Sequence, residues 1–403
     1  MINQRRPSQN QGNTRWGKSR LSVVNASAYD PWVVGLVTCL TAIGLIMVVS
    51  TSVAIAEARN LHPLYYFWRQ LLSIIIVVVL ALNILRFRLA FLSSYSTHLL
   101  FIAITLLVLV FVPGLGREVN GSMRWLDFGF FTFQSSELAK LAVIVYLAAY
   151  LVRHNEAVRG DFLGFIKPII VVAIVVSLLI LEPDYGSAVV LFFTCLGMLF
   201  LAGVPLLRFV IWGITTIGSL AGLSLLAPYR LERLFSFTDP WADPFDKGFQ
   251  LVQALIAFGR GEWTGVGLGN SVQKLYYLPE VHTDFVFAVI GEELGLLGSL
   301  CVIVLFLFLF FRIFQIGGIA EKNGFLFAAY LTYGIGLLLG LQAFVNIGVN
   351  LGVLPTKGLP LPFLSYGNNN LIVTGIAIAL VLRAGYEAGA IGTFFNKRVA
   401  ARG

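Results

Sequence analysis

The chain has 403 residues, of which 58% are hydrophobic and only 12% are charged. This composition lies far from that of soluble globular proteins and indicates an integral membrane protein. The formal net charge is +8, but the Lys and Arg residues are dispersed among short connections and the two ends of the chain. Such dispersal argues against a nucleic-acid-binding face and fits the charge distribution of a membrane protein.

Residues 1–31 are rich in Gln, Asn, Ser and Arg and hold no apolar core, so we predict a disordered cytosolic tail rather than a cleaved signal peptide. Ten apolar runs follow. A helix needs about 20 apolar residues to cross the membrane, and short alternating strands are not seen, so we predict an all-α polytopic domain over 32–390 with about ten transmembrane helices. The runs are 32–54, 66–85, 98–114, 136–152, 165–182, 186–203, 205–227, 285–314, 325–352 and 369–389.

Basic residues set the predicted orientation. With ten spans, Lys and Arg are concentrated in both tails and in alternate connections, which places both tails, including 391–403, in the cytoplasm. The one long connection, 228–284, then lies on the outer face between the seventh and eighth spans. It is rich in Pro, Gly, Trp and charge, and long structured loops of this kind tend to carry function.

Asp284 directly precedes the eighth predicted span and therefore lies near the outer membrane interface. Two interpretations are open. A carboxylate next to a helix N-terminus can cap the helix. A carboxylate in a partly dry cleft can also act as a general base.

The fourth predicted span contains Glu137 and Lys140, three residues apart on one helix face. A Lys at mid-membrane costs about 2.5 to 3.5 kcal/mol, so it needs an acidic partner, a wet cavity or a path to the interface. Lys140 either pairs with Glu137 on its own helix or faces a cleft and meets a carboxylate from another span or an anionic ligand.

In the ninth predicted span, Gln342, Asn346 and Asn350 recur at a spacing of four and share one helix face. They either join helices through hydrogen bonds or line a polar cavity.

Charged residues also occur in the predicted outer connections. Each alone is typical of a solvated loop, but together they would form a vestibule in which cations bind phosphate and carboxylates act as acid or base. Motifs of ATPases, metalloproteases and serine hydrolases are not found. The vestibule residues are Arg124, Glu182, Asp184, Arg230, Arg233, Lys274, His282 and Lys357.

Six motifs follow one another along the chain: NGSMRW, FQSSELAK, LEPDYGSA, GVGLGNSVQKLYYLPEVHTDF, GEELG and PTKGLPLPFLSYG. In this order they resemble the SEDS family of bacterial cell-wall proteins, the FtsW/RodA group, from about residue 32 to 390. Within that family, GLGNSVQKLYYLPEVHTDF and the long polar N-terminal tail resemble the cell-division branch more than the elongation branch.

The resemblance implies a peptidoglycan glycosyltransferase that polymerises lipid II at the outer face of the cytoplasmic (inner) membrane, concentrated at the division septum. It makes Asp284 of the HTDF motif the essential residue, our candidate general base, and it implies that Lys140 approaches Asp284. The candidate substrate-binding residues are Lys140, Glu137, Arg124, Lys274, His282 and Lys357.

The implied partners are lipid II, the lipid bilayer, a class B penicillin-binding transpeptidase and a divisome activator subcomplex. A divalent cation, Mg²⁺ or Mn²⁺, is an alternative to protein cations at the departing pyrophosphate. Two other functions stay open. A lipid II flippase would use the polar face of the ninth span, and a non-catalytic divisome scaffold would have interchangeable vestibule charges.

Two stretches depart from the family pattern. Gln134-Ser135-Ser136-Glu137 lacks the proline of the usual QPSE, which would stiffen the start of a helix. The segment 365–370 reads SYGNNN instead of SYGGSS, and a lost glycine forbids some backbone conformations, although Asn tolerates left-handed geometry better than most residues.

Overall fold

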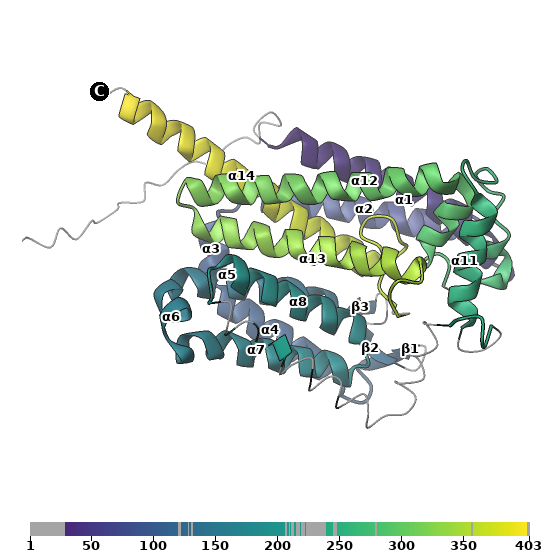
Figure 1. Ribbon diagram of the computed structural model, residues 1–403, viewed down its shortest axis with the longest axis horizontal. Coiled ribbons are helices and arrows are strands. Elements are labelled where there is room, and N and C mark those ends of the chain that lie inside the picture. Colours follow the sequence, from purple (N-terminus) through teal and green to yellow (C-terminus); the bar gives the residue numbers. More distant parts are fainter. Residues whose placement is uncertain are drawn as a thin grey trace, which may run out of the picture.

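The structure is a computed structural model that describes residues 29–400 except 120–121, 128, 130–131, 206–207, 209, 211–212, 215–217, 219–221, 223–238, 245–247, 279 and 356–357. For 119, 276–277 and 390–400 it describes the backbone only. Long helices run side by side along the longest axis, and a short helix and a small sheet lie near one end (Figure 1). We call this the outer end, because it carries the described part of the predicted outer loop.

Nine of the ten predicted spans correspond to described helices. Seven are long and apolar enough to cross a membrane, and two apolar ones are shorter. The seventh predicted span, 205–227, lies largely outside the described residues and stays a prediction. The long helices are α1 (Pro31–Ala58), α2 (Tyr65–Ile84), α5 (Ser135–Arg153), α7 (Phe162–Leu181), α12 (Val286–Lys322), α13 (Leu326–Asn350) and α14 (Asn368–Ala400), and the shorter ones are α4 (Ser96–Leu109) and α8 (Tyr185–Leu201).

Some elements were not predicted from the apolar runs. The chain between α4 and α5 forms a three-stranded antiparallel sheet in the order β1-β2-β3, so the all-α prediction holds for the spans but not for this connection. Part of the outer loop is helical as well. These elements are β1 (Gly116–Val119), β2 (Ser122–Asp127), β3 (Thr132–Gln134), α3 (Leu89–Ser94), α6 (Asn155–Gly160), α11 (Phe249–Gly261) and a π-helical turn at Gln273–Tyr277.

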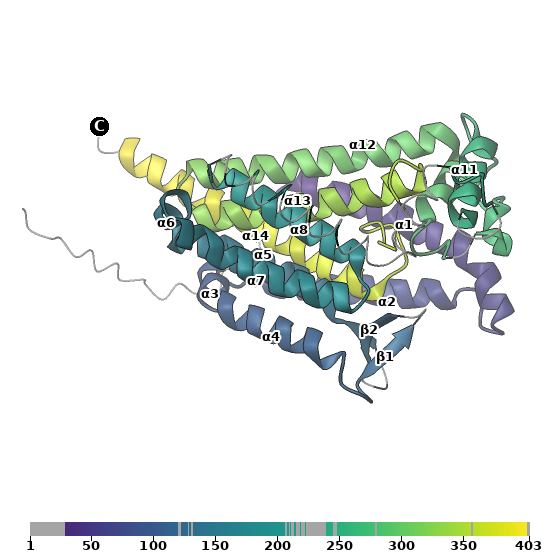
Figure 2. The same cartoon turned by 60° about the horizontal axis from the view of Figure 1, so that its bottom comes forward.

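The centre of the bundle is built from α5, α13 and α14, which are buried over most of their length, whereas α1 and α2 bury far less. Gly334 of α13 allows close packing, because a Cβ there would lie 2.6 Å from side-chain atoms of Ile144 and Met198. Many large apolar side chains on the outer helices are exposed, as expected for surfaces that face lipid. Figure 2 shows α3 and α4 on one side of this bundle.

The chain enters α1 and leaves the α14 span at the same end of the bundle, opposite the outer end. Asp30 caps α1 by accepting from the backbone N–H groups of Trp32 and Val33, and its other oxygen pairs with Arg312 at 2.6 Å. The rings of Tyr29 and Tyr386 lie 5.2 Å apart. An even number of crossings satisfies this arrangement, as the ten predicted spans would.

Helix α12 is interrupted at Gly295, whose backbone has φ 67° and ψ −163°. The outer loop supplies the hydrogen bonds that the interruption releases. The N–H groups of Val266 and Gly267 donate to the carbonyls of Glu292 and Glu293, each at 3.0 Å. Two N–H groups beyond the break, at 296 and 297, donate back to carbonyls 262 and 263. The eighth predicted span is therefore two helical pieces joined by backbone pairing to the outer loop.

We expect Gly295→Ala to lower the free energy of unfolding by about 2 kcal/mol or more, because only glycine adopts this conformation without strain. A Cβ at this position would also lie 2.4 Å from the backbone nitrogen of Gly265. The measurement is the thermal unfolding midpoint of the purified protein in detergent. Gly259→Ala in α11 is the matched control, since a Cβ there meets nothing within 4 Å and Ala favours a helix. Equal midpoints for the two variants would contradict this account.

Candidate functional site

Asp284 lies on the wall of a cavity of about 460 Å³ at the outer end of the bundle. We call it the Asp284 cavity. Its lining comes from β2, α11, the turn at 280–284 and the segment that leads into α14, so residues far apart in sequence meet there. Arg124 is the one basic residue among its described lining. The lining residues are Ser122, Arg124, Trp125, Gln134, Gln250, Glu280, Thr283, Asp284, Gly358, Pro360, Tyr366, Gly367, Asn369 and Asn370.

A tight turn holds Asp284 in place. The carbonyl of Glu280 accepts the N–H groups of Thr283, Asp284 and Phe285 at 3.1, 3.1 and 3.3 Å, and Glu280 itself has a positive φ of 54°. The residue that caps α12 is Phe285, and no side chain hydrogen-bonds in this cap. The N-cap interpretation of Asp284 was therefore wrong, and the described residues donate no hydrogen bond to its carboxylate.

The polar face of α13 fixes this turn. Asn346 and Asn350 both donate side-chain N–H groups to the carbonyl of Asp284, at 2.9 and 3.0 Å. Asn350 also accepts the N–H of Ala288, and Asn346 donates to the carbonyl of Leu359 at 2.6 Å. With Gln342, which donates to the Pro360 carbonyl, these amides join α13 to the Asp284 turn and to the segment at 359–360. The interpretation that they connect segments through hydrogen bonds is confirmed.

Asp284 is a stronger base than an ordinary aspartate. Burial raises its pKa to about 7, and the negative charges of Glu280 and Asp184 act in the same direction, while Arg124 opposes them. A carboxylate with a pKa near the working pH is suited to take up a proton and release it again.

Lys140 does not pair with Asp284 in this structure. Its ammonium group contacts Glu137 at 2.9 Å on the same helix, and both side chains are buried. The second oxygen of Glu137 accepts from Asn370 at 3.0 Å, and Asn370 lines the Asp284 cavity. The intrahelical ion pair is thus confirmed, and the link from Lys140 to the cavity runs through Glu137 and Asn370.

The SYGNNN segment has unstrained backbone angles, and one of its asparagines makes a hydrogen bond that holds the start of α14. None of residues 365–370 has a positive φ, so the glycine that the family pattern has there is not needed for backbone freedom. Asn369 donates to the carbonyl of Thr132 at 3.0 Å, which ties the start of α14 to β3. The start of α5 also lacks the family's proline, and Gln134 at that cap donates to the hydroxyl of Ser136.

Arg124 projects from β2 and is held by the connection between α7 and α8. It donates to the carbonyls of Glu182 and Pro183, the latter at 2.6 Å, and lies 3.9 Å from the carboxylate of Asp184. Burial raises the pKa of Glu182 to about 8, with Asp184 adding to the shift and Arg124 opposing it. At neutral pH the protonated form of Glu182 dominates, so Glu182 adds little negative charge beside Arg124.

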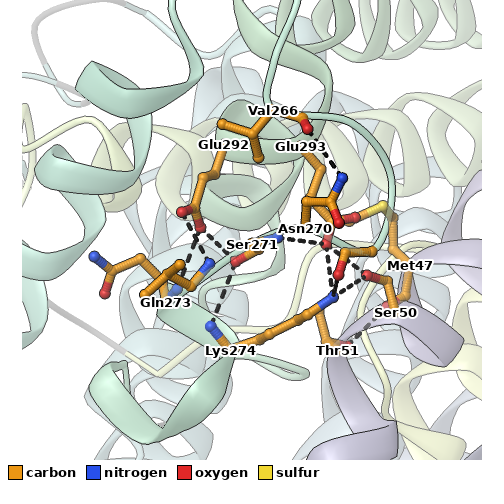
Figure 3. Close-up of polar contacts among 12 residues, drawn as sticks. Met47, Ser50, Thr51, Val266, Asn270, Ser271, Gln273, Lys274, Glu292 and Glu293 are labelled. Carbon is orange, nitrogen blue, oxygen red and sulfur yellow. Dashed lines mark hydrogen bonds and ion pairs between the residues drawn. The ribbon is translucent and has the colours of Figure 1, made fainter.

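Lys274 and the two glutamates of GEELG form a buried polar cluster (Figure 3). Lys274 contacts Glu293 at 3.1 Å and donates to the hydroxyl of Ser50 in α1. Glu292 accepts from Arg260 at 2.9 Å, from the hydroxyl of Ser271 and from the N–H of Val272 at 3.1 Å. The cluster anchors the outer loop to α12 and α1, so part of the predicted role of Lys274, loop positioning, matches its contacts.

His282 lies between two tyrosines rather than in the Asp284 cavity. Its ring centroid is 5.6 Å from those of Tyr66 and Tyr366, and burial lowers the pKa of its imidazole. His282 and Lys274 line a second cavity of about 300 Å³. Of the remaining predicted residues, Arg230, Arg233 and Lys357 lie outside the described part of the chain.

Sequence reasoning missed Glu280 as a site residue, although it stands four residues before Asp284. Its signal was available, because an acid next to a candidate base changes the pKa of that base. No group of three or more His, Cys, Asp or Glu side chains in the described residues could hold a metal ion.

Comparison with known proteins shows which family the chain resembles. The family model described as cell cycle protein, covering FtsW, RodA and SpoVE, matches residues 31–389. The probable peptidoglycan glycosyltransferase FtsW of Hahella chejuensis is 53% identical over 354 residues, which cover 88% of this chain and 89% of that protein. The protein of the same name from Coxiella burnetii is 49% identical over 360 residues, which cover 89% of this chain and 97% of the relative.

Solved structures of related proteins resemble this chain as well. A chain from "Structural coordination of polymerization and crosslinking by a peptidoglycan synthase complex" is 30% identical, with a TM-score of 0.73 over 90% of this chain and 98% of that one. The rod shape determining protein RodA of Thermus thermophilus is 27% identical, with a TM-score of 0.66 over the same shares. The similarity thus includes the bundle and the outer end together.

We expect Asn350→Leu to lower the free energy of unfolding, because the Asp284 carbonyl loses one donor and the buried N–H of Ala288 loses one of its two acceptors, keeping only the Phe285 carbonyl. The loss should be about 1 to 3 kcal/mol, measured as a lower thermal midpoint. Asn83→Leu is the control: Asn83 is exposed on α2 and donates only within its own helix, to Val79. Equal midpoints for the two variants would refute the role given to the α13 amides.

Proposed function

Because the chain belongs to the FtsW, RodA and SpoVE family of cell cycle proteins, we propose that it is a peptidoglycan glycosyltransferase that polymerises lipid II. One observation carries the proposal. A carboxylate with a pKa of about 7 and an arginine, Asp284 and Arg124, line a single cavity at the outer end of the bundle. A base and a cation in one outer cavity are what transfer of a glycosyl group from a lipid pyrophosphate requires.

The reaction joins the 4-hydroxyl of one lipid-linked sugar to the anomeric carbon of another. Asp284 takes the hydroxyl proton as the new glycosidic C–O bond forms. The bond from the anomeric carbon to the pyrophosphate oxygen breaks, and the lipid pyrophosphate leaves with the electron pair. Asp284 then releases its proton to water, which a pKa near 7 permits at neutral pH.

Arg124 is the described cation that can stabilise the departing pyrophosphate. Its guanidinium is held by the 182 and 183 carbonyls, so the loss of side-chain freedom on binding is small. Lys140 and Glu137 support the cavity wall through Asn370 rather than contact Asp284. Lys357 remains a proposed pyrophosphate ligand, adjacent in sequence to Gly358 of the cavity lining.

The flippase alternative has lost its main support. It relied on a hydrophilic path along Gln342, Asn346 and Asn350, and these amides are engaged with backbone carbonyls. The scaffold alternative gives no reason for a base and a cation to share a cavity.

The proposal extends to location and partners. The relatives named FtsW and the crosslinking synthase complex support a place in septal wall synthesis beside a class B penicillin-binding transpeptidase, with a divisome subcomplex as activator. Both termini are proposed to be cytoplasmic, because the described ends of the bundle lie opposite the Asp284 cavity and carry basic residues.

Replacing the base tests the function. Asp284→Asn should reduce polymer formation from lipid II by about 10²- to 10⁴-fold, measured with purified protein in the presence of its transpeptidase partner. Asp127→Asn, an aspartate of β2 that pairs with the exposed Arg117, should leave the rate unchanged. Thermal unfolding of each variant confirms that it is folded. Full activity of a folded Asp284→Asn protein would disprove the assignment.

The pH dependence tests the electrostatics. A base acts only when ionised, so the rate should fall as pH drops through about 7. Glu280→Gln removes a negative charge that raises the pKa of Asp284, so the acid limb of the pH–rate profile should move to lower pH. Glu118→Gln, an exposed change on β1, is the control and should leave the limb in place. A limb that stays fixed, or moves to higher pH, in Glu280→Gln contradicts the proposed coupling.

A further inference from the structure

A second cavity, of about 300 Å³, lies on the other side of the turn that carries Asp284. We call it the Arg59 cavity. The end of α1 and the segment before the turn line it, and Glu280 lines both cavities. The 280–284 turn is therefore the partition between them. The lining residues are Ile55, Ala58, Arg59, Lys274, Leu278, Glu280, Val281 and His282.

The Arg59 cavity carries two basic side chains. The described residues give the Arg59 guanidinium one hydrogen-bond partner, the hydroxyl of Tyr66 at 2.9 Å, so most of its five N–H donors stay available. Lys274 lines the same cavity, but its ammonium already donates to Glu293, to Ser50 of α1 and to the carbonyl of Gly269, so the unused donors are those of Arg59. A guanidinium with unused donors in a cavity is suited to an oxyanion such as a phosphate.

Polymerisation presents two such anions at once. The donor and the acceptor each carry a lipid pyrophosphate, and only the donor loses its own. The Asp284 cavity holds one described cation, and two multiply charged groups at that cation would repel each other strongly in a partly dry site. Separate anion sites on the two sides of the base avoid this repulsion and still let both sugars reach it.

We propose that the Arg59 cavity binds the pyrophosphate of the second lipid-linked substrate, while the Asp284 cavity binds that of the first. The inference rests on the proposed function, because it is that reaction which brings two lipid pyrophosphates together. Glu280 lines both sites, and the strained backbone of this residue sets the partition between them.

The test counts the lipid II molecules bound to a variant that cannot polymerise them. Lipid II is added to the full-length Asp284→Asn protein in detergent, and native mass spectrometry measures the number of lipid II molecules per chain. We expect two for Asp284→Asn, and one for Asp284→Asn with Arg59→Gln, in which the Arg59 cavity loses affinity for lipid II by about tenfold or more. Asp284→Asn with Arg59→Lys should bind the second molecule with intermediate affinity, because the charge is kept and the bidentate geometry is lost.

The matched control is Arg69→Gln in the same background. Arg69 also donates to a tyrosine hydroxyl, that of Tyr65 at 3.2 Å, but it does not line the Arg59 cavity. It should leave two molecules bound. A single molecule bound to Asp284→Asn, or two bound despite Arg59→Gln in a protein with an unchanged thermal midpoint, overturns the proposal.

A competition experiment distinguishes lipid II from phospholipid as the ligand of the Arg59 cavity. Excess phosphatidylglycerol should not displace the second lipid II molecule, and displacement at comparable concentration would mean that the cavity takes phospholipid headgroups instead. Failure of the proposed function would be seen separately, as polymer made by the Asp284→Asn protein. Failure of the present inference would be seen in the binding count, whatever the polymer assay gives.

Discussion

The two side-chain amides that hold the backbone carbonyl of Asp284 are the contacts on which the site depends. Asn346 and Asn350 are neutral, so they fix the turn without adding a charge that would weaken the base. Positioning of this kind matters, because a displacement of about 1 Å at a reacting group can cost about 100-fold in rate. The same helix face binds the segment at 359–360, so one helix positions two neighbouring segments of the cavity lining.

Two buried glutamates near the start of α12 anchor the outer loop. Glu292 and Glu293 are fully buried, and an unpaired charge there would be strongly destabilising, by about 3 to 5 kcal/mol. Arg260 and Lys274 pair with them, and hydroxyl and backbone donors add further hydrogen bonds. The break at Gly295 then makes the loop and helix exchange backbone hydrogen bonds. The outer loop is thus anchored to α12 by both side-chain and backbone contacts.

Sequence patterns predicted the spans well, because a membrane helix must satisfy all its backbone groups internally and so leaves a long apolar run. The small sheet at 116–134 had no such signal, since its strands are three to six residues long. The break at Gly295 was not predicted, because a single glycine within a long helical run does not by itself indicate an interruption. The motifs predicted that Arg124 and Asp284 share a site. They could not predict whether Asp284 caps α12 or which carboxylate pairs with Lys140, because both depend on distances in the folded chain. Asp284 does not cap α12, and Lys140 pairs within its own helix.

The pairing of Lys140 with Glu137 has a consequence for the chemistry. A lysine in direct contact with Asp284 would stabilise its ionised form, lower its pKa and make it a weaker base. In this structure the positive charge of Lys140 is matched by Glu137, and only the amide of Asn370 reaches on toward the cavity. The field at Asp284 is then set by Glu280 and Asp184 against Arg124. A bound pyrophosphate, itself negative, would act in the same direction as the two acids, which makes ionised Asp284 a stronger proton acceptor but raises the pH at which it ionises.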